Sequence, residues 1–135
     1  MTFNSKNRLR ASLGAAVAVL LGGLAASPAL AHHSGAMFDR TRTVEVKGVV
    51  KSFGWTNPHA YVELMVKGPG GTVEQWNLEG GSPTVMAKQG WRKSSLKPGD
   101  QVTLIIHPMR DGTKGGDLEG AVLADGSRVG GAPPL

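Results

Sequence analysis

Apolar and polar residues alternate along several short segments of the chain, as in β-strands that bury one face. The segments 60–67 (AYVELMVK) and 101–107 (QVTLIIH) both place a valine, leucine or isoleucine at every second position. The same reasoning predicts further strands over 44–53, 72–78 and about 117–123. The sequence therefore predicts five strands.

Two local signals refine this pattern. In the first predicted strand the alternation shifts phase at Gly48-Val49-Val50, which predicts a bulge or a sharp bend there. Between the third and fourth strands, Ser82 is suited to an N-cap and Pro83 to a first helical position, and Gly90 is suited to the left-handed residue that ends a helix. A short helix is expected at this place.

Five strands, a bend in the first and one helix between the third and fourth are typical of the OB-fold, a small Greek-key barrel. We therefore predict an all-β fold with one short helix, an OB-like barrel over residues 44–129. A half-open β-roll or a sandwich is the alternative. Residues 32–43 would form an N-terminal arm and residues 130–135 a flexible tail.

The first 31 residues have the features of an export signal. Basic residues occupy the start, an apolar stretch runs from Leu13 to Ala26, and small residues stand at Ala29 and Ala31. Fourteen helical residues span only about 21 Å, against roughly 30 Å of membrane hydrocarbon. We expect cleavage after Ala31 by the general secretory route, and a periplasmic protein with no stable membrane anchor.

Charge and composition exclude several classes of protein. The whole chain has a formal net charge of +5, but residues 32–135 hold 12 basic and 10 acidic residues, a net charge of +2. This balance argues against a nucleic-acid partner. The absence of cysteine excludes disulfides, thiolate metal sites and a cysteine nucleophile. No nucleophile elbow or paired-carboxylate motif is present, so no catalytic residue is assigned and an enzyme is not the favoured class.

Several motifs resemble one family of small exported proteobacterial proteins of unknown function. They are the opening His32-His33-Ser34 with Ala36-Met37-Phe38-Asp39, then Gly54-Trp55-Thr56-Asn57-Pro58-His59, Gly80-Gly81-Ser82-Pro83, Gly90-Trp91 and Leu96-Lys97-Pro98-Gly99-Asp100. The resemblance implies export and a single domain. It implies no catalytic residues.

The chain has four histidines: His32, His33, His59 and His107. Cleavage after Ala31 would give His32 a free α-amine, so that amine and imidazole could chelate one ion, and His33 could instead join the amine on the metal. Such nitrogen ligands suit Cu(II). In an OB-fold, the loops at His59 and His107 would lie at neighbouring rims, so these histidines are candidates to complete a copper site. A flexible, solvated start and ordinary turn or strand positions are the alternative interpretation.

Two functions stay open. The first is a periplasmic binding protein that holds a transition metal. Copper is the candidate cofactor, and no other cofactor is expected. The second is a metal-free module that binds a protein, peptide or glycan through the first rim loop, with Trp55 and Asn57 as ligand-binding residues. In either case the partner is an unidentified periplasmic protein or small ligand.

Overall fold

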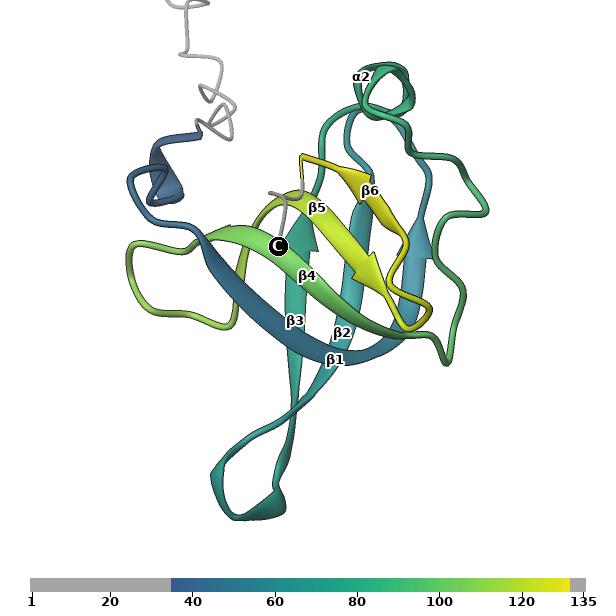
Figure 1. The fold of residues 1–135 in the computed structure, drawn as a ribbon. Helices are drawn as coiled ribbons and strands as arrows, with labels where there is room; N and C mark the ends of the chain where they lie inside the picture. Colours follow the sequence, from purple (N-terminus) through teal and green to yellow (C-terminus); the bar gives the residue numbers. More distant parts are fainter. Residues whose placement is uncertain (1–34, 132–135) are drawn as a thin grey trace, which may run out of the picture. The chain divides into compact units, whose positions relative to one another are not determined.

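Strands dominate the computed structural model, which describes residues 35–131. In chain order its elements are η2 (Gly35–Met37), β1 (Val44–Gly54), β2 (Tyr61–Lys67), η3 (Pro69–Gly71), β3 (Val73–Glu79), α2 (Pro83–Lys88), β4 (Gln101–Pro108), β5 (Gly115–Leu123) and β6 (Arg128–Gly130). Figure 1 shows these elements coloured along the sequence. No helix within residues 35–131 is long and apolar enough to cross a membrane.

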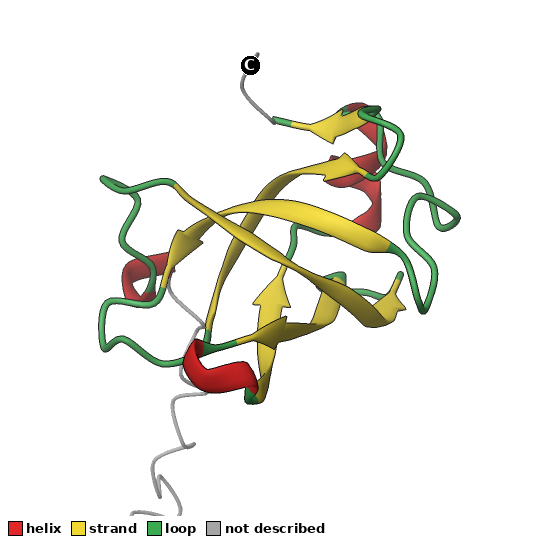
Figure 2. Ribbon diagram, turned by 60° about the horizontal axis from the view of Figure 1, so that its bottom comes forward, coloured by secondary structure: helices red, strands yellow, loops and turns green. Residues whose placement is uncertain are grey.

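The strands close into a barrel. The sheet order is β3-β2-β1-β4-β5-β6, and an additional pairing joins β3 to β5. This closing pair is parallel, with Asn77, Leu78 and Glu79 opposite Gly115, Gly116 and Asp117, whereas the other strand pairs are antiparallel. Figure 2 shows the strands wrapping around a common interior. The five-stranded OB-like barrel is confirmed, and the β3–β5 pairing distinguishes it from a half-open roll.

Alternation along the strands places the core inside this barrel. Val62, Leu64 and Leu104 are almost completely buried, as the sequence pattern predicts. The helix α2 begins as expected, with Ser82 as the N-cap and Pro83 in the first turn, and Gly90 has a φ of 92°. Its residue Met86 is buried, and so is Trp91, which follows the helix. The helix and Trp91 therefore belong to the hydrophobic core.

Strand β1 bends as predicted, but its bulge lies later than the pattern indicates. The register between β1 and β2 shifts between Val50 and Ser52, not at Gly48. At Gly48 a Cβ atom would lie 2.5 Å from the Met65 carbonyl oxygen, so only glycine allows the two backbones to approach there. The close approach of β1 to β2 at Gly48 and the bulge after Val50 are thus two neighbouring features of one bent strand.

The boundaries differ from the sequence prediction in two places. Strand β5 begins at Gly115, two residues before the expected start, and the short strand β6 was not predicted. Gly130, which the prediction placed in the tail, ends β6 and pairs with Gly120. The predicted signal segment 1–31 and residues 132–135 of the tail lie outside the described residues.

Candidate functional site

His107 lies near the end of β4 and projects from the outer face of the barrel. Its Nδ1 atom lies 2.7 Å from the carbonyl oxygen of Arg42, and because a carbonyl can only accept, Nδ1 is the donor. Its Nε2 atom lies 3.4 Å from an Oε1 atom of Glu119. The hydrogen bond at Nδ1 therefore fixes the ring and directs Nε2 toward the carboxylate on β5.

The N-terminal arm is held beside this histidine. Phe38 forms an isolated bridge with Met109 and is only 6% exposed. The amide of Asp39 donates to the carbonyl of Pro108 at 2.8 Å, and the amide of Arg110 donates to the carbonyl of Met37 at 2.9 Å. Residues 37–39 thus pack against the start of the loop between β4 and β5.

An acidic side chain stands next to His107 across the sheet. Asp117 on β5 pairs with His107 on β4 and with Glu79 on β3. The arm residue Arg40 reaches Asp117 with an Nη2–Oδ2 distance of 2.6 Å, and the aspartate side chain is 15% exposed. Burial raises the pKa of Asp117 above its usual 3.8, the Arg40 guanidinium opposes this rise, and the Glu119 carboxylate adds to it.

His59 lies on the other side of Asp117. It follows the loop between β1 and β2, and its Nδ1 atom lies 3.0 Å from the Gly80 carbonyl oxygen and 2.9 Å from an oxygen of Glu79. The side chain of His59 is 48% exposed. Like His107, this histidine has its Nδ1 atom next to a backbone carbonyl.

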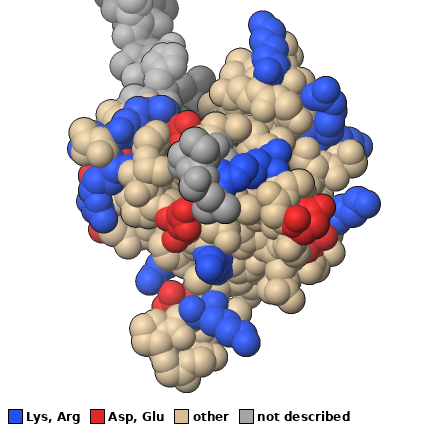
Figure 3. All heavy atoms as spheres, in the orientation of Figure 1, with Lys and Arg blue, Asp and Glu red and all other residues tan. Residues whose placement is uncertain are grey.

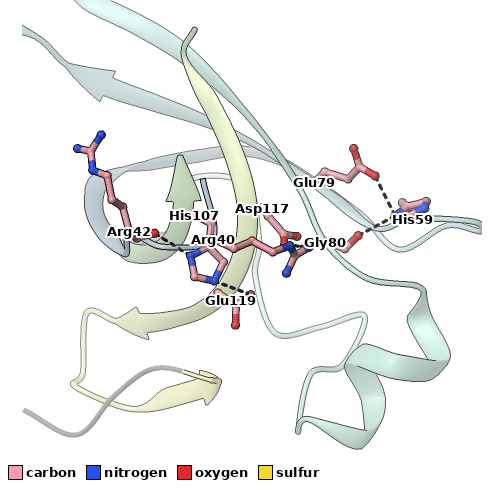
Figure 4. A network of polar contacts seen from close by, with 8 residues as sticks. All are labelled: Arg40, Arg42, His59, Glu79, Gly80, His107, Asp117 and Glu119. Carbon is pink, nitrogen blue, oxygen red and sulfur yellow. Dashed lines mark hydrogen bonds and ion pairs between the residues drawn. The ribbon is translucent and has the colours of Figure 1, made fainter. Parts of the chain in front are cut away.

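The two histidines do not share a partner. Figure 4 shows the Arg40–Asp117 ion pair between them, with His107 next to Glu119 and His59 next to Glu79. Since β5 lies between β4 and β3, about two strand spacings, roughly 10 Å, separate the strands that carry these contacts. Within residues 35–131, no three histidine or acidic side chains are grouped so that they could hold a metal ion. His32 and His33 lie outside the described residues, so the predicted four-histidine site stays a prediction.

Trp55 lies at the start of the first rim loop and is half-buried. It packs against the core and contacts Phe53 edge-to-face, with the ring centroids 5.8 Å apart. It also lines an open hollow of about 640 Å³ together with residues of α2 and the following loop, namely Pro83, Thr84, Ala87, Lys88 and Arg92. Asn57, two residues further along the loop, is exposed.

Trp55 and Asn57 are therefore neighbours in one loop, but only Trp55 lines the hollow.

Sequence reasoning missed three residues of this outer face. Glu119 contacts the His107 ring, Asp117 is the pairing partner of His107 on β5, and Arg40 contacts Asp117. Each of the three stands at an ordinary polar position of the chain. The alternation of Asp117 and Glu119 around the buried Leu118 does indicate that both carboxylates share a face. Nothing in the sequence indicates that Arg40 would form an ion pair with Asp117, because that contact depends on how the N-terminal arm packs against the barrel.

The fold and these contacts define a small OB-like barrel with a docked N-terminal arm and a histidine–carboxylate cluster on its outer face. The model of a family of unknown function (DUF6152) matches residues 21–118, and the chain belongs to this family. This confirms the resemblance to a family of unknown function that the sequence motifs carry.

Comparison with characterised proteins adds little. No curated protein matches the chain. A crystal structure of the mitochondrial single-stranded DNA-binding protein Rim1 from S. cerevisiae is similar, with 12% sequence identity and a TM-score of 0.45. The match covers 62% of this chain and 94% of that chain. We draw nothing about function from a likeness of this size.

Proposed function

We propose that the protein is exported to the periplasm and binds a transition-metal ion, copper, through His32 and His33 at its processed N-terminus together with His107. The α-amine and imidazole of His32 would form a chelate, and the α-amine, with a usual pKa near 8, can lose its proton to a metal at neutral pH. His107 would add an imidazole from the barrel.

The hydrogen bond from His107 Nδ1 to the Arg42 carbonyl is the observation that carries this proposal. Histidines that bind metals commonly donate their second ring nitrogen to a carbonyl or carboxylate, which fixes the tautomer and leaves the other nitrogen for the ion. Here that other nitrogen is Nε2, and it lies beside the Glu119 carboxylate. An additional anionic oxygen near Nε2 favours a cation at this position.

The docked arm supports the same proposal through its length. Phe38 is fixed against Met109, close in the chain to His107. His32 stands six positions before Phe38 in the chain, a span of at most about 21 Å when fully extended. The processed N-terminus would therefore stay within reach of the histidine–carboxylate cluster.

The experiment is a titration with Cu(II) of the protein recovered after export, whose first residue is read by mass spectrometry. We expect one stoichiometric site, loss of that site in His32→Ala, and at least tenfold weaker binding in His107→Ala. His59→Ala is the matched control and should bind as the wild type does, because His59 contacts Glu79 instead. An N-terminus other than His32, or equal affinities of wild type and His32→Ala, would refute the proposal.

A second candidate function is a metal-free module that holds a protein, peptide or glycan at the first rim loop. The hollow beside Trp55 favours it, because this hollow joins an aromatic ring to the basic residues Lys88 and Arg92. Under this alternative, Trp55→Ala abolishes capture of the partner and His32→Ala leaves it intact. Asn57→Ala should weaken capture only if the exposed part of the loop also touches the partner.

A further inference from the structure

A depression on the outer surface of the barrel lies apart from both features above. It has a volume of about 590 Å³ and is formed by the middle of β1 and the adjoining ends of β2, β4 and β5. A hollow of this size falls in the range of small-ligand sites, about 300–1,000 Å³. None of its lining residues belongs to the candidate copper site or to the hollow beside Trp55.

The floor of the depression carries exposed apolar side chains next to the polar Gln101 and Thr103 of β4. Val49 on β1 pairs with Met65 on β2, and both line the hollow, as does Val122 of β5. Val49 is 40% exposed. Outward positions on a small barrel are ordinarily polar, so Val49, Met65 and Val122 offer an apolar surface here that an apolar ligand could cover.

Two lysines stand at one end of this floor. The β1–β2 pairing ends at Val49 and Met65, and two residues beyond this pair Lys47 on β1 and Lys67 on β2 both line the depression. Two like charges that line one hollow repel each other. Among the described residues neither lysine forms an ion pair, whereas Lys51 pairs with Glu63 and Lys114 with Glu74.

The wider charge pattern agrees with an anionic ligand. None of the residues that line the depression is aspartate or glutamate. On the face that Figure 3 draws, to which β1 and β4 contribute, more basic than acidic side chains are visible. An anionic group between Lys47 and Lys67 would relieve their repulsion, and an apolar chain attached to it would cover the floor.

We propose that this depression binds an amphipathic anion, an unbranched acyl chain that ends in a carboxylate. The carboxylate lies between Lys47 and Lys67, and the chain runs over Val49 and Met65 toward Val122. The lining residues include no aromatic side chain, which favours an aliphatic chain over a ring. This inference is independent of the proposed copper site, because it uses none of the same residues.

The test is calorimetric titration of the full chain as recovered from cells with dodecanoate, below the concentration at which it forms micelles. Acetate carries the same head group without the chain, and dodecyltrimethylammonium carries the same chain with the opposite charge. We expect saturable one-to-one binding of dodecanoate that is at least tenfold tighter than that of either control ligand. No saturable binding of dodecanoate, or equal binding of dodecyltrimethylammonium, would overturn the proposal.

Matched variants locate the site. Lys47→Ala and Lys67→Ala should each weaken dodecanoate binding about two- to fivefold, as expected for a solvent-exposed ion pair. Val49→Asp should weaken it at least tenfold. Lys88→Ala and Val85→Asp make the same changes at a lysine and an exposed valine outside the depression, and they should bind as the wild type does.

Backbone NMR shifts give a readout that does not depend on these variants. Dodecanoate should move the amide signals of Val49, Met65 and Val122 and leave those around Trp55 and His107 in place. Equal effects of Val49→Asp and Val85→Asp, or shifts concentrated outside the depression, would show that the fatty acid binds elsewhere and would overturn the assignment. Should Val49→Asp fail to fold, the two lysine variants and the shifts still decide the question.

Discussion

Phe38→Ala should release the N-terminal arm from the barrel without unfolding the barrel. The ring of Phe38 is buried, but it lies outside the main core cluster and packs at the start of the β4–β5 loop. The arm's other contacts are a few hydrogen bonds and the Arg40–Asp117 and Arg110–Asp39 ion pairs. The phenylalanine is therefore the main apolar anchor of this segment.

The structure sets the size of the effect. Burial of a phenylalanine side chain contributes about 1.5–3 kcal/mol, whereas removal of such a ring from a closed core costs about 3–5 kcal/mol. Because the arm can detach while the strands stay paired, the loss of global unfolding free energy should be limited to the smaller range, about 1.5–3 kcal/mol. Met37→Ala is the matched control; Met37 is 37% exposed, and its truncation should cost less than about 0.5 kcal/mol.

Hydrogen exchange followed by NMR tests this reasoning directly. In Phe38→Ala the amides of Asp39 and Arg110, which bond across the arm–loop contact, should lose protection, while the amide of Leu104 in β4 keeps its protection relative to global unfolding. The reasoning fails if arm and strand amides lose protection together, because the arm would then be an integral part of the barrel. It also fails if Asp39 and Arg110 stay as protected as in the wild type.

Two further predictions concern strand β5. Gly116→Ala should destabilise the protein by about 1–3 kcal/mol in urea unfolding, because a Cβ atom there would lie 2.5 Å from the His107 carbonyl oxygen; an unchanged unfolding midpoint would show that the strands can move apart. Asp117→Asn should become more stable relative to the wild type as the pH rises from 3 to 7. Burial raises the folded-state pKa of Asp117 above 3.8, so the stability that the protonated wild-type side chain contributes is complete below that value and is lost as the pH rises through the folded pKa. Asparagine does not titrate, so the variant keeps its stability over this range. If the stability of Asp117→Asn relative to the wild type fell as the pH rose, the assignment would be contradicted.

Most of the barrel could be predicted from the sequence because its strands alternate cleanly. The segments 60–67 and 101–107 show one apolar face each, and the structure places strands at Tyr61–Lys67 and Gln101–Pro108. The helix was equally readable, since Ser82, Pro83 and Gly90 act through local backbone preferences. Local signals of this kind do not depend on the rest of the fold.

Features that depend on distant partners could not be read in the same way. Strand β6 has only three residues, and it exists because Val129 pairs with Ala121 on β5. The early start of β5 at Gly115 similarly depends on pairing with Asn77 of β3, where a Cβ atom on Gly115 would lie 2.6 Å from the Asn77 carbonyl oxygen. Both sites are rich in glycine, which a sequence pattern treats as a turn signal.

The candidate site shows the same division. The sequence identifies His59 and His107 as the barrel's histidines. The order of strands in an OB-fold places His59 in the loop between β1 and β2 and His107 near the end of β4, and the structure agrees. It does not reveal that β5 separates their contacts, because that spacing follows from the parallel β3–β5 pair that closes the barrel. Nor does it reveal the arm contacts of His107, which join residues 65 positions apart.

The arm connects the family motif to the barrel. The opening segment 32–39 contains two histidines and, after them, Phe38 and Asp39, which anchor the arm at Met109 and Pro108. If the proposed copper site is correct, an anchor at Phe38 would limit the distance from the N-terminal ligands to His107, and weak individual ligands would act together as a chelate. The largely buried Asp117 contributes to the same contact, because the guanidinium of Arg40 in the arm offsets part of the cost of burying this carboxylate. The anchoring of the arm by Phe38 can be tested without any metal, separately from the proposed copper site.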